Sequence, residues 1–74
     1  MLFRSLYIKL FGAQEALLMG DENPLAKEYF YKILERVIKI AELNKLSKLL
    51  YLAREAKETG DAAEVISTLE EMLE

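Results

Sequence analysis

The chain of 74 residues contains no cysteine, no histidine and no tryptophan, and it has one proline and three glycines. Without cysteine it can form no disulfide bond and offers no thiolate. Without histidine it lacks the commonest metal ligand and the usual general base near neutral pH. Its serines and threonines therefore have no histidine to activate them, and its isolated glycines build no phosphate-binding loop. We predict no enzymatic activity, no catalytic residues, no metal site and no cofactor.

The charge of the chain restricts its partners. The formal net charge is −3 and the isoelectric point is about 5.0, which argues against binding to nucleic acid. Acidic residues concentrate toward the end of the chain, which includes Glu70, Glu71 and Glu74, and we interpret them as a solvated face. No segment is long and apolar enough to span a membrane, so we expect a soluble protein, either cytoplasmic or from recombinant expression, with no membrane partner.

The sequence repeats itself at an interval of about 40 residues, which is a spacing typical of stacked supersecondary units. The matching positions are Leu6 with Leu46, Leu10 with Leu50, Ala13 with Ala53, Glu15 with Glu55, Ala16 with Ala56, and Gly20-Asp21 with Gly60-Asp61. Because one such unit cannot bury its apolar face alone, the repeat predicts two units that pack against each other.

Four helices are predicted, at about residues 2–19, 24–43, 45–59 and 62–74. Gly20 and Gly60 are placed to end the first and third helices, because glycine accepts the left-handed backbone at a helix end. Asn23 and Pro24 are typical of a helix start. No segment alternates polar and apolar residues as a strand does.

The remaining two helix ends depend on polar side chains. We expect Asn44 to act as a left-handed C-cap, as an N-cap, or as both, and Asp61 to start the last helix in a capping box with Glu64. Because the linkers are short, sequential helices should be antiparallel neighbours. The expected fold is all-α, with one domain over residues 1–74 and four antiparallel helices arranged as two stacked helix hairpins.

The first helix has more apolar surface than a terminal helix with one neighbouring face should bury. The second helix is also broadly apolar and is expected to be central. We predict an interaction surface on the first helix, because a contiguous apolar patch on a soluble protein usually marks such a site. Its candidate residues are Phe3, Tyr7, Ile8, Phe11 and Leu18, with Tyr51 from the third helix. In the alternative, the first helix bends inward and buries nearly all of them.

Gly12 lies inside the first predicted helix, where glycine costs about 1 kcal/mol relative to alanine. Two interpretations stay open. Gly12, Ala13 and Ala16 could allow the close approach of another helix, or Gly12 could be a tolerated kink or a site that avoids a clash within the monomer.

The stretch from Gly20-Asp21 through Ala26 to Glu35 resembles the second helix of a tetratricopeptide repeat. Gly60-Asp61 with Val65 and Leu69 is more loosely similar to it, and Leu52, Ala53 and Ala56 fall where that family keeps conserved positions of its first helix. The interval differs from the family's repeat of about 34 residues, and the family's tryptophan is missing.

Capped helices joined by very short loops also resemble computationally designed helical-repeat miniproteins. That resemblance implies a scaffold, a binder or a self-assembling building block. Three functions follow as expectations: a homodimer formed through the apolar face of the first helix, a binder of one different protein through the same face, and a carrier of a small apolar ligand between the second and third helices.

Overall fold

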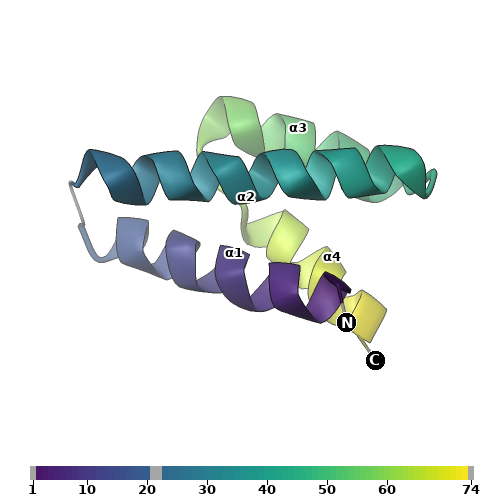
Figure 1. Cartoon of the computed structure of the whole chain (residues 1–74), viewed down its shortest axis with the longest axis horizontal. Coiled ribbons are helices and arrows are strands. Elements are labelled where there is room, and N and C mark those ends of the chain that lie inside the picture. The colour runs from purple at the N-terminus through teal and green to yellow at the C-terminus, as the bar shows by residue number, and fades with distance from the viewer. Residues whose placement is uncertain (1, 21–22, 74) are drawn as a thin grey trace.

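The computed structural model describes residues 2–20 and 23–73. In these two segments the chain forms four helices and no strand: α1 (Leu2–Leu18), α2 (Pro24–Leu43), α3 (Ser47–Thr59) and α4 (Ala63–Leu73) (Figure 1). The expected all-α fold with four helices is therefore confirmed. Asp21, Glu22 and Glu74, which belong to the predicted repeat and to the predicted acidic end, lie outside the described residues.

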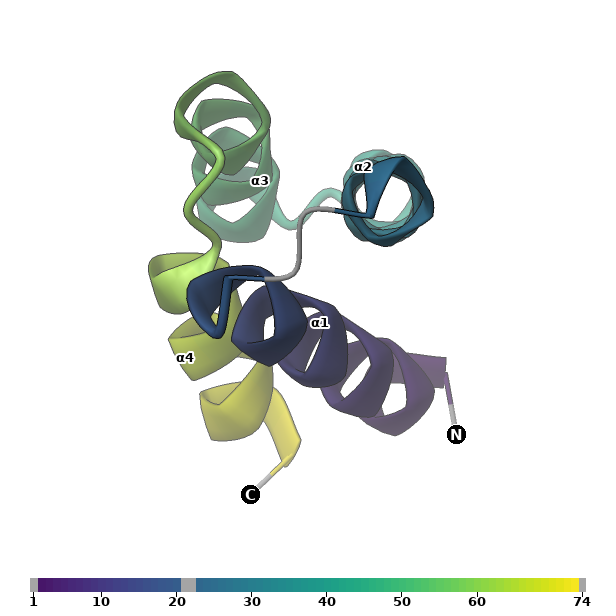
Figure 2. The same cartoon turned by 90° about the vertical axis from the view of Figure 1, so that its left-hand side faces the viewer.

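The four helices form a closed ring. Helices α1 and α2 run antiparallel beside each other, α3 returns along α2, and the short helix α4 packs against both α3 and α1 (Figures 1 and 2). Two sequence-based expectations are corrected here. Helix α1 has two neighbours rather than one, because the 11-residue α4 folds back onto it, and α2 contacts α1 and α3 rather than occupying the centre.

The core lies inside this ring and is built from one face of each helix. The buried residues on α1, Leu6, Leu10 and Ala13, follow intervals of four and three, as expected for the inward face of a packed helix. Helix α3 contributes two alanines, whose small side chains allow the helix to lie close to its neighbours. The other buried apolar residues are Phe30, Ile33, Leu34, Val37, Ala41, Leu49, Ala62, Val65, Ile66 and Leu69.

The internal repeat of the sequence corresponds to equivalent positions in the two hairpins. Ala13 on α1 and Ala53 on α3 are both buried, and Gly20 and Gly60 both adopt a left-handed backbone, with φ of 85° and 82°. The helix ends predicted at these two glycines are confirmed. Leu50 is only partly buried, whereas its counterpart Leu10 is fully buried, so the two hairpins are not equivalent at this position.

The turn from α2 to α3 differs from its prediction. Asn44 has φ of −102°, and the left-handed residue is Lys45, with φ of 56°. The side-chain Nδ2 of Asn44 donates to the carbonyl oxygen of Ile40 over 2.9 Å, and the Leu46 N–H donates to the Ala41 carbonyl oxygen, also over 2.9 Å. This second bond spans five residues and is the 6→1 hydrogen bond of a Schellman motif. That motif places its left-handed residue one position after Asn44. The same turn delays the start of α3 to Ser47.

The side chain of Gln14 connects α1 to the turn between α3 and α4 through two hydrogen bonds. It is a buried polar residue on α1, and its Oε1 accepts from the Ala62 N–H over 3.1 Å while its Nε2 donates to Asp61 Oδ1 over 3.2 Å. Asp61 Oδ1 also accepts from the Ala63 N–H, so Asp61 does cap the start of α4 as predicted. The capping box with Glu64 is not formed, because the Asp61 N–H donates to Thr59 Oγ1 instead.

Replacement of Lys45 by glycine should stabilise the protein by about 0.5–1 kcal/mol, because glycine adopts positive φ without the steric cost borne by lysine. Chemical denaturation would measure the change. Lys45→Ala is the matched control, since it removes the same charge but retains a Cβ, and it should give no gain. Equal effects of the two substitutions would show that the charge and not the backbone is responsible.

Replacement of Gln14 by leucine should destabilise the protein by about 1–3 kcal/mol, because the buried Ala62 N–H would lose its acceptor. Gln14→Glu keeps an acceptor oxygen but places a carboxylate against Asp61. The glutamate variant should therefore recover stability relative to the parent when the pH is lowered, and the leucine variant should not. Thermal unfolding over a pH series would test both statements, and a wild-type-like leucine variant would contradict this role of Gln14.

Candidate interaction surface

Helix α1 carries a second regular face, on the side away from the core. Arg4, Ile8, Phe11, Glu15 and Leu18 are all exposed and follow one another at intervals of four, three, four and three residues. The three apolar members are 59%, 45% and 71% exposed. This spacing is the pattern by which helices form a coiled-coil contact with a partner helix. We call these five residues the outer seam.

Phe3 and Tyr7 have a different position from the outer seam. Both are half-buried and pack against the core, so the fold itself uses most of their apolar surface. The Tyr7 ring also lies beside Phe11, with 6.0 Å between ring centroids and a tilt of 45°. Tyr7 therefore connects the core to the outer seam and restricts the orientation of Phe11.

Tyr51, the sixth candidate residue, is separated from the others. It is 66% exposed on α3, and α3 packs against α2 and α4 rather than α1 within the described residues. Its hydroxyl donates to Glu55, and this hydrogen bond, together with the negative charge of Glu55, raises the pKa of Tyr51. The structure thus brings Ile8, Phe11 and Leu18 together on one face and leaves Tyr51 outside it.

Two features of α1 leave room beside the outer seam. A hollow of about 510 Å³ is lined by Arg4, Tyr7 and Ile8 together with Leu73 of α4. Gly12 is exposed, and a Cβ added there would meet no atom within 4 Å. A clash within the monomer therefore does not explain Gly12. The face that bears Gly12 is open to a close approach by another helix.

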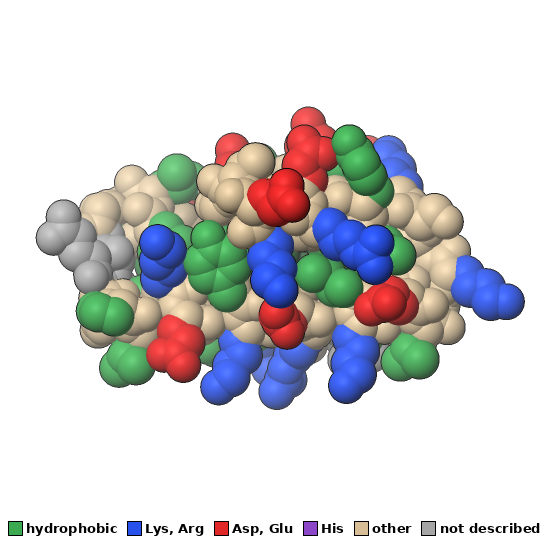
Figure 3. All heavy atoms as spheres, turned by 90° about the horizontal axis from the view of Figure 1, so that it is seen from above, with side chains coloured by type: hydrophobic (Ala, Val, Ile, Leu, Met, Phe, Trp, Pro, Cys, Tyr) green, Lys and Arg blue, Asp and Glu red, His purple; other side chains and the backbone are tan. Residues whose placement is uncertain are grey.

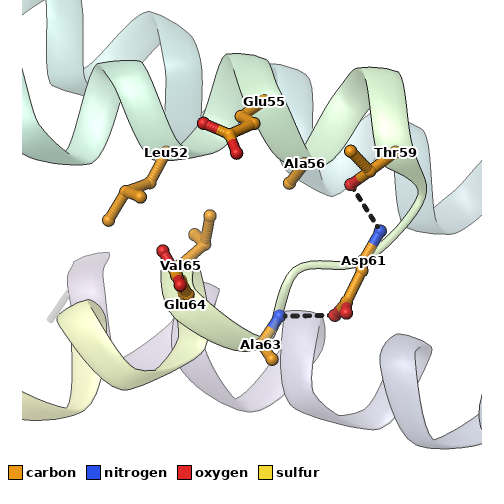
Figure 4. A pocket seen from close by; sticks show the side chains of 8 residues that line it. All are labelled: Leu52, Glu55, Ala56, Thr59, Asp61, Ala63, Glu64 and Val65. Atoms are coloured by element: carbon orange, nitrogen blue, oxygen red, sulfur yellow. Dashed lines mark hydrogen bonds between the residues drawn. The ribbon is translucent and has the colours of Figure 1, made fainter.

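A second hollow, of about 240 Å³, lies between α3 and α4 (Figure 4). Its rim carries the carboxylates of Glu55, Asp61 and Glu64 beside Leu52 and Val65, and Asp61 is already engaged at the helix start. No group of three or more acidic residues that could hold a metal ion occurs within residues 2–20 and 23–73. Three of the eight lining residues of this hollow are acids, and it lies between α3 and α4, so it differs from the apolar site expected between the second and third helices.

None of the helices in the part of the chain that the structure describes combines the length and the apolar character needed to cross a membrane. Comparisons with models of protein families, with characterised proteins and with solved structures found nothing that matches this chain.

Sequence reasoning found the apolar residues of the outer seam but missed its charged members. Arg4 and Glu15 are charged and so do not belong to the apolar pattern, although their spacing from Ile8 and Phe11 is present in the sequence. The broad apolar face of α2 led to the expectation of a central helix, yet Leu25, Tyr29 and Leu43 are exposed. The ring arrangement explains this difference, since α2 has neighbours on two sides only.

Replacement of Glu55 by glutamine should lower the pKa of Tyr51 toward the ordinary tyrosine value near 10, because it removes the charge that opposes ionisation. Ultraviolet titration would measure it, with Tyr51→Phe identifying the signal of this tyrosine. Since the folded-state pKa is raised, the interaction stabilises the fold below pH 10 and is lost as the pH rises through the folded-state value. An unchanged titration curve would contradict the contact.

Proposed function

We propose that this protein is a non-enzymatic helical scaffold that acts by association with a second copy of itself through the outer seam of α1. The supporting observation is the 4-3-4-3 spacing of Arg4, Ile8, Phe11, Glu15 and Leu18 on an exposed face. An isolated helix surface has no need of this register, whereas a helix pair requires it. The inner face of the same helix uses the same spacing to pack against its neighbours.

The charges of the outer seam favour one arrangement of the two helices. In an antiparallel pair centred between Ile8 and Phe11, Arg4 of each copy lies opposite Glu15 of the other, and Ile8 lies opposite Phe11. In a parallel pair Arg4 would face Arg4 of the other copy and Glu15 would face Glu15, and both contacts are repulsive. From Arg4 to Glu15 the seam is therefore self-complementary in the antiparallel arrangement, as a two-fold symmetric dimer requires, whereas Leu18 has no seam residue opposite it.

The expected dimer is weak. Burial of a large apolar side chain contributes about 1.5–3 kcal/mol at most, and the outer seam has three exposed apolar members. Association costs several kcal/mol of rigid-body freedom, and the exposed charge pairs add little. Gly12 and the hollow beside Ile8 favour close packing of α1 from the second copy. A dissociation equilibrium that is adjustable by single substitutions suits a building block of larger assemblies.

The same face could bind a different protein, which is the alternative function. That protein would need an apolar helix with an acidic and a basic residue in complementary positions, and no observation on this chain selects it over a second copy. Carriage of a small apolar ligand between α2 and α3 is a lower alternative, since Phe30, Leu34 and Leu49 are fully buried on these two helices.

Reversal of either charge should weaken the dimer, and reversal of both should restore it. Arg4→Glu and Glu15→Arg each place like charges opposite one another, so each should raise the dissociation constant about tenfold. The double variant re-forms the pairs with opposite polarity and should return close to the parent value. Sedimentation equilibrium over a concentration series would measure all four proteins.

Matched controls come from α3. Lys48→Glu and Glu58→Arg make the same changes of net charge on exposed residues away from α1 and should leave the dissociation constant unchanged. A parent protein that stays monomeric throughout the series would overturn the proposed homodimer. Equal weakening by the control variants, or a double variant no better than the singles, would overturn the antiparallel register.

A further inference from the structure

A groove between α1 and α2 combines positive charge with apolar surface. It encloses about 370 Å³, a volume at the small end of the range of small-molecule sites. Lys9 of α1 and Arg36 and Lys39 of α2 line it, together with the apolar side chains of Leu6, Ile40 and Leu43. No acidic residue lines it. This groove lies on a different side of α1 from the outer seam.

None of the three bases of the groove forms an ion pair within the described part of the protein. The ion pairs of the described residues join Lys57 to Glu35 and Arg54 to Glu42, and both cross the interface between α2 and α3. Glu35 and Glu42 of α2 thus face α3, where Lys57 holds the pKa of Glu35 below its ordinary range. In Figure 3, Lys and Arg side chains project along the lower edge of the view with an acidic side chain beside them, while acids and bases alternate over the middle.

Convergence of bases is unexpected in a chain whose net charge is −3. Like charges on neighbouring helices repel, and a local arrangement that costs stability without compensation often marks a functional site. The apolar part of the groove is also costly, because Leu43 is 76% exposed at its edge. One ligand would relieve both costs at once, namely a molecule with an anionic head and an apolar chain.

We propose that this groove binds a single-chain anionic amphiphile, with its carboxylate among Lys9, Arg36 and Lys39 and its alkyl chain over Leu6, Ile40 and Leu43. The length of the groove supports a small ligand over a helical peptide. Its lining on α2 runs from Arg36 to Leu43, which is about 10 Å of helix, too short to seat a partner helix of several turns. Arginine and lysine both form charge-assisted hydrogen bonds with a carboxylate.

Titration with decanoate, below the concentration at which it forms micelles, tests this site. Amide chemical shifts should change at the lining residues of α1 and α2. The double variant Arg36→Gln with Lys39→Gln should weaken decanoate binding about tenfold, the value for loss of one or two charge-assisted hydrogen bonds. Leu43→Ala should also weaken binding, and because Leu43 is exposed the variant should fold normally.

The matched control is the double variant Lys27→Gln with Lys48→Gln, which makes the same charge change on exposed residues outside the groove and should bind decanoate like the parent. Equal weakening by both double variants would overturn the site, because general electrostatic attraction would explain the binding. Decyltrimethylammonium that binds as well as decanoate would overturn the role of the bases. Acetate that competes at equal concentration would overturn the role of the apolar lining.

The binding of decanoate in the groove does not require the dimer. The Glu15→Arg variant alters the outer seam and leaves every groove residue in place, so it should bind decanoate with the parent's affinity. A loss of decanoate binding in this variant would place the amphiphile on the outer seam and would overturn the groove as its site.

Discussion

The structure depends on the packing of α1 between α2 and α4. Leu6 and Leu10 are buried between these helices, and Gln14 binds the turn that leads into α4. Because α4 has only 11 residues and closes the ring against α1, its position depends on this contact as well as on α3. The apolar contacts supply most of the favourable free energy, and the two hydrogen bonds of Gln14 determine the register of the turn. A helix held on two sides can then present its third side to a partner in a defined orientation.

The two faces of α1 have different roles for a simple geometric reason. A helix of 3.6 residues per turn can carry two separate rows of residues spaced by four and three, and α1 has one row inside and one outside. The inside row is apolar throughout. The outside row includes Arg4 and Glu15, which limit how strongly it can associate and which orientation it prefers. Tyr7 lies between the two rows, half-buried against the core and in ring contact with Phe11.

Much of the fold was predictable because its signals are local. The glycines at 20 and 60 ended their helices as expected, Asn23 and Pro24 began α2, and the interval of the repeat indicated two similar hairpins. The turn at Asn44 was predicted incorrectly because the bond from Leu46 to Ala41 moved the left-handed residue to Lys45, and no preference of lysine indicates this. The capping box at Asp61 failed in part because Thr59 competed for the Asp61 N–H. For the candidate surface, the exposure of Ile8, Phe11 and Leu18 agreed with expectation, whereas Tyr51 lies on α3, which does not pack against α1.

By itself the sequence determined where the helices form and which residues have chemistry to offer, since caps, glycines and the absence of histidine and cysteine act through neighbouring atoms or through composition. Only the tertiary structure decided which apolar surface remains exposed, because that depends on how many neighbours each helix has and on which side they lie. The return of α4 onto α1 covered the inner row and left the outer seam open. Glu35 and Glu42 of α2 pair with bases of α3, and the bases between α1 and α2 form no ion pair within the described residues. The neighbours of each helix follow from packing in three dimensions, although the spacing of the outer seam is already present in the order of residues.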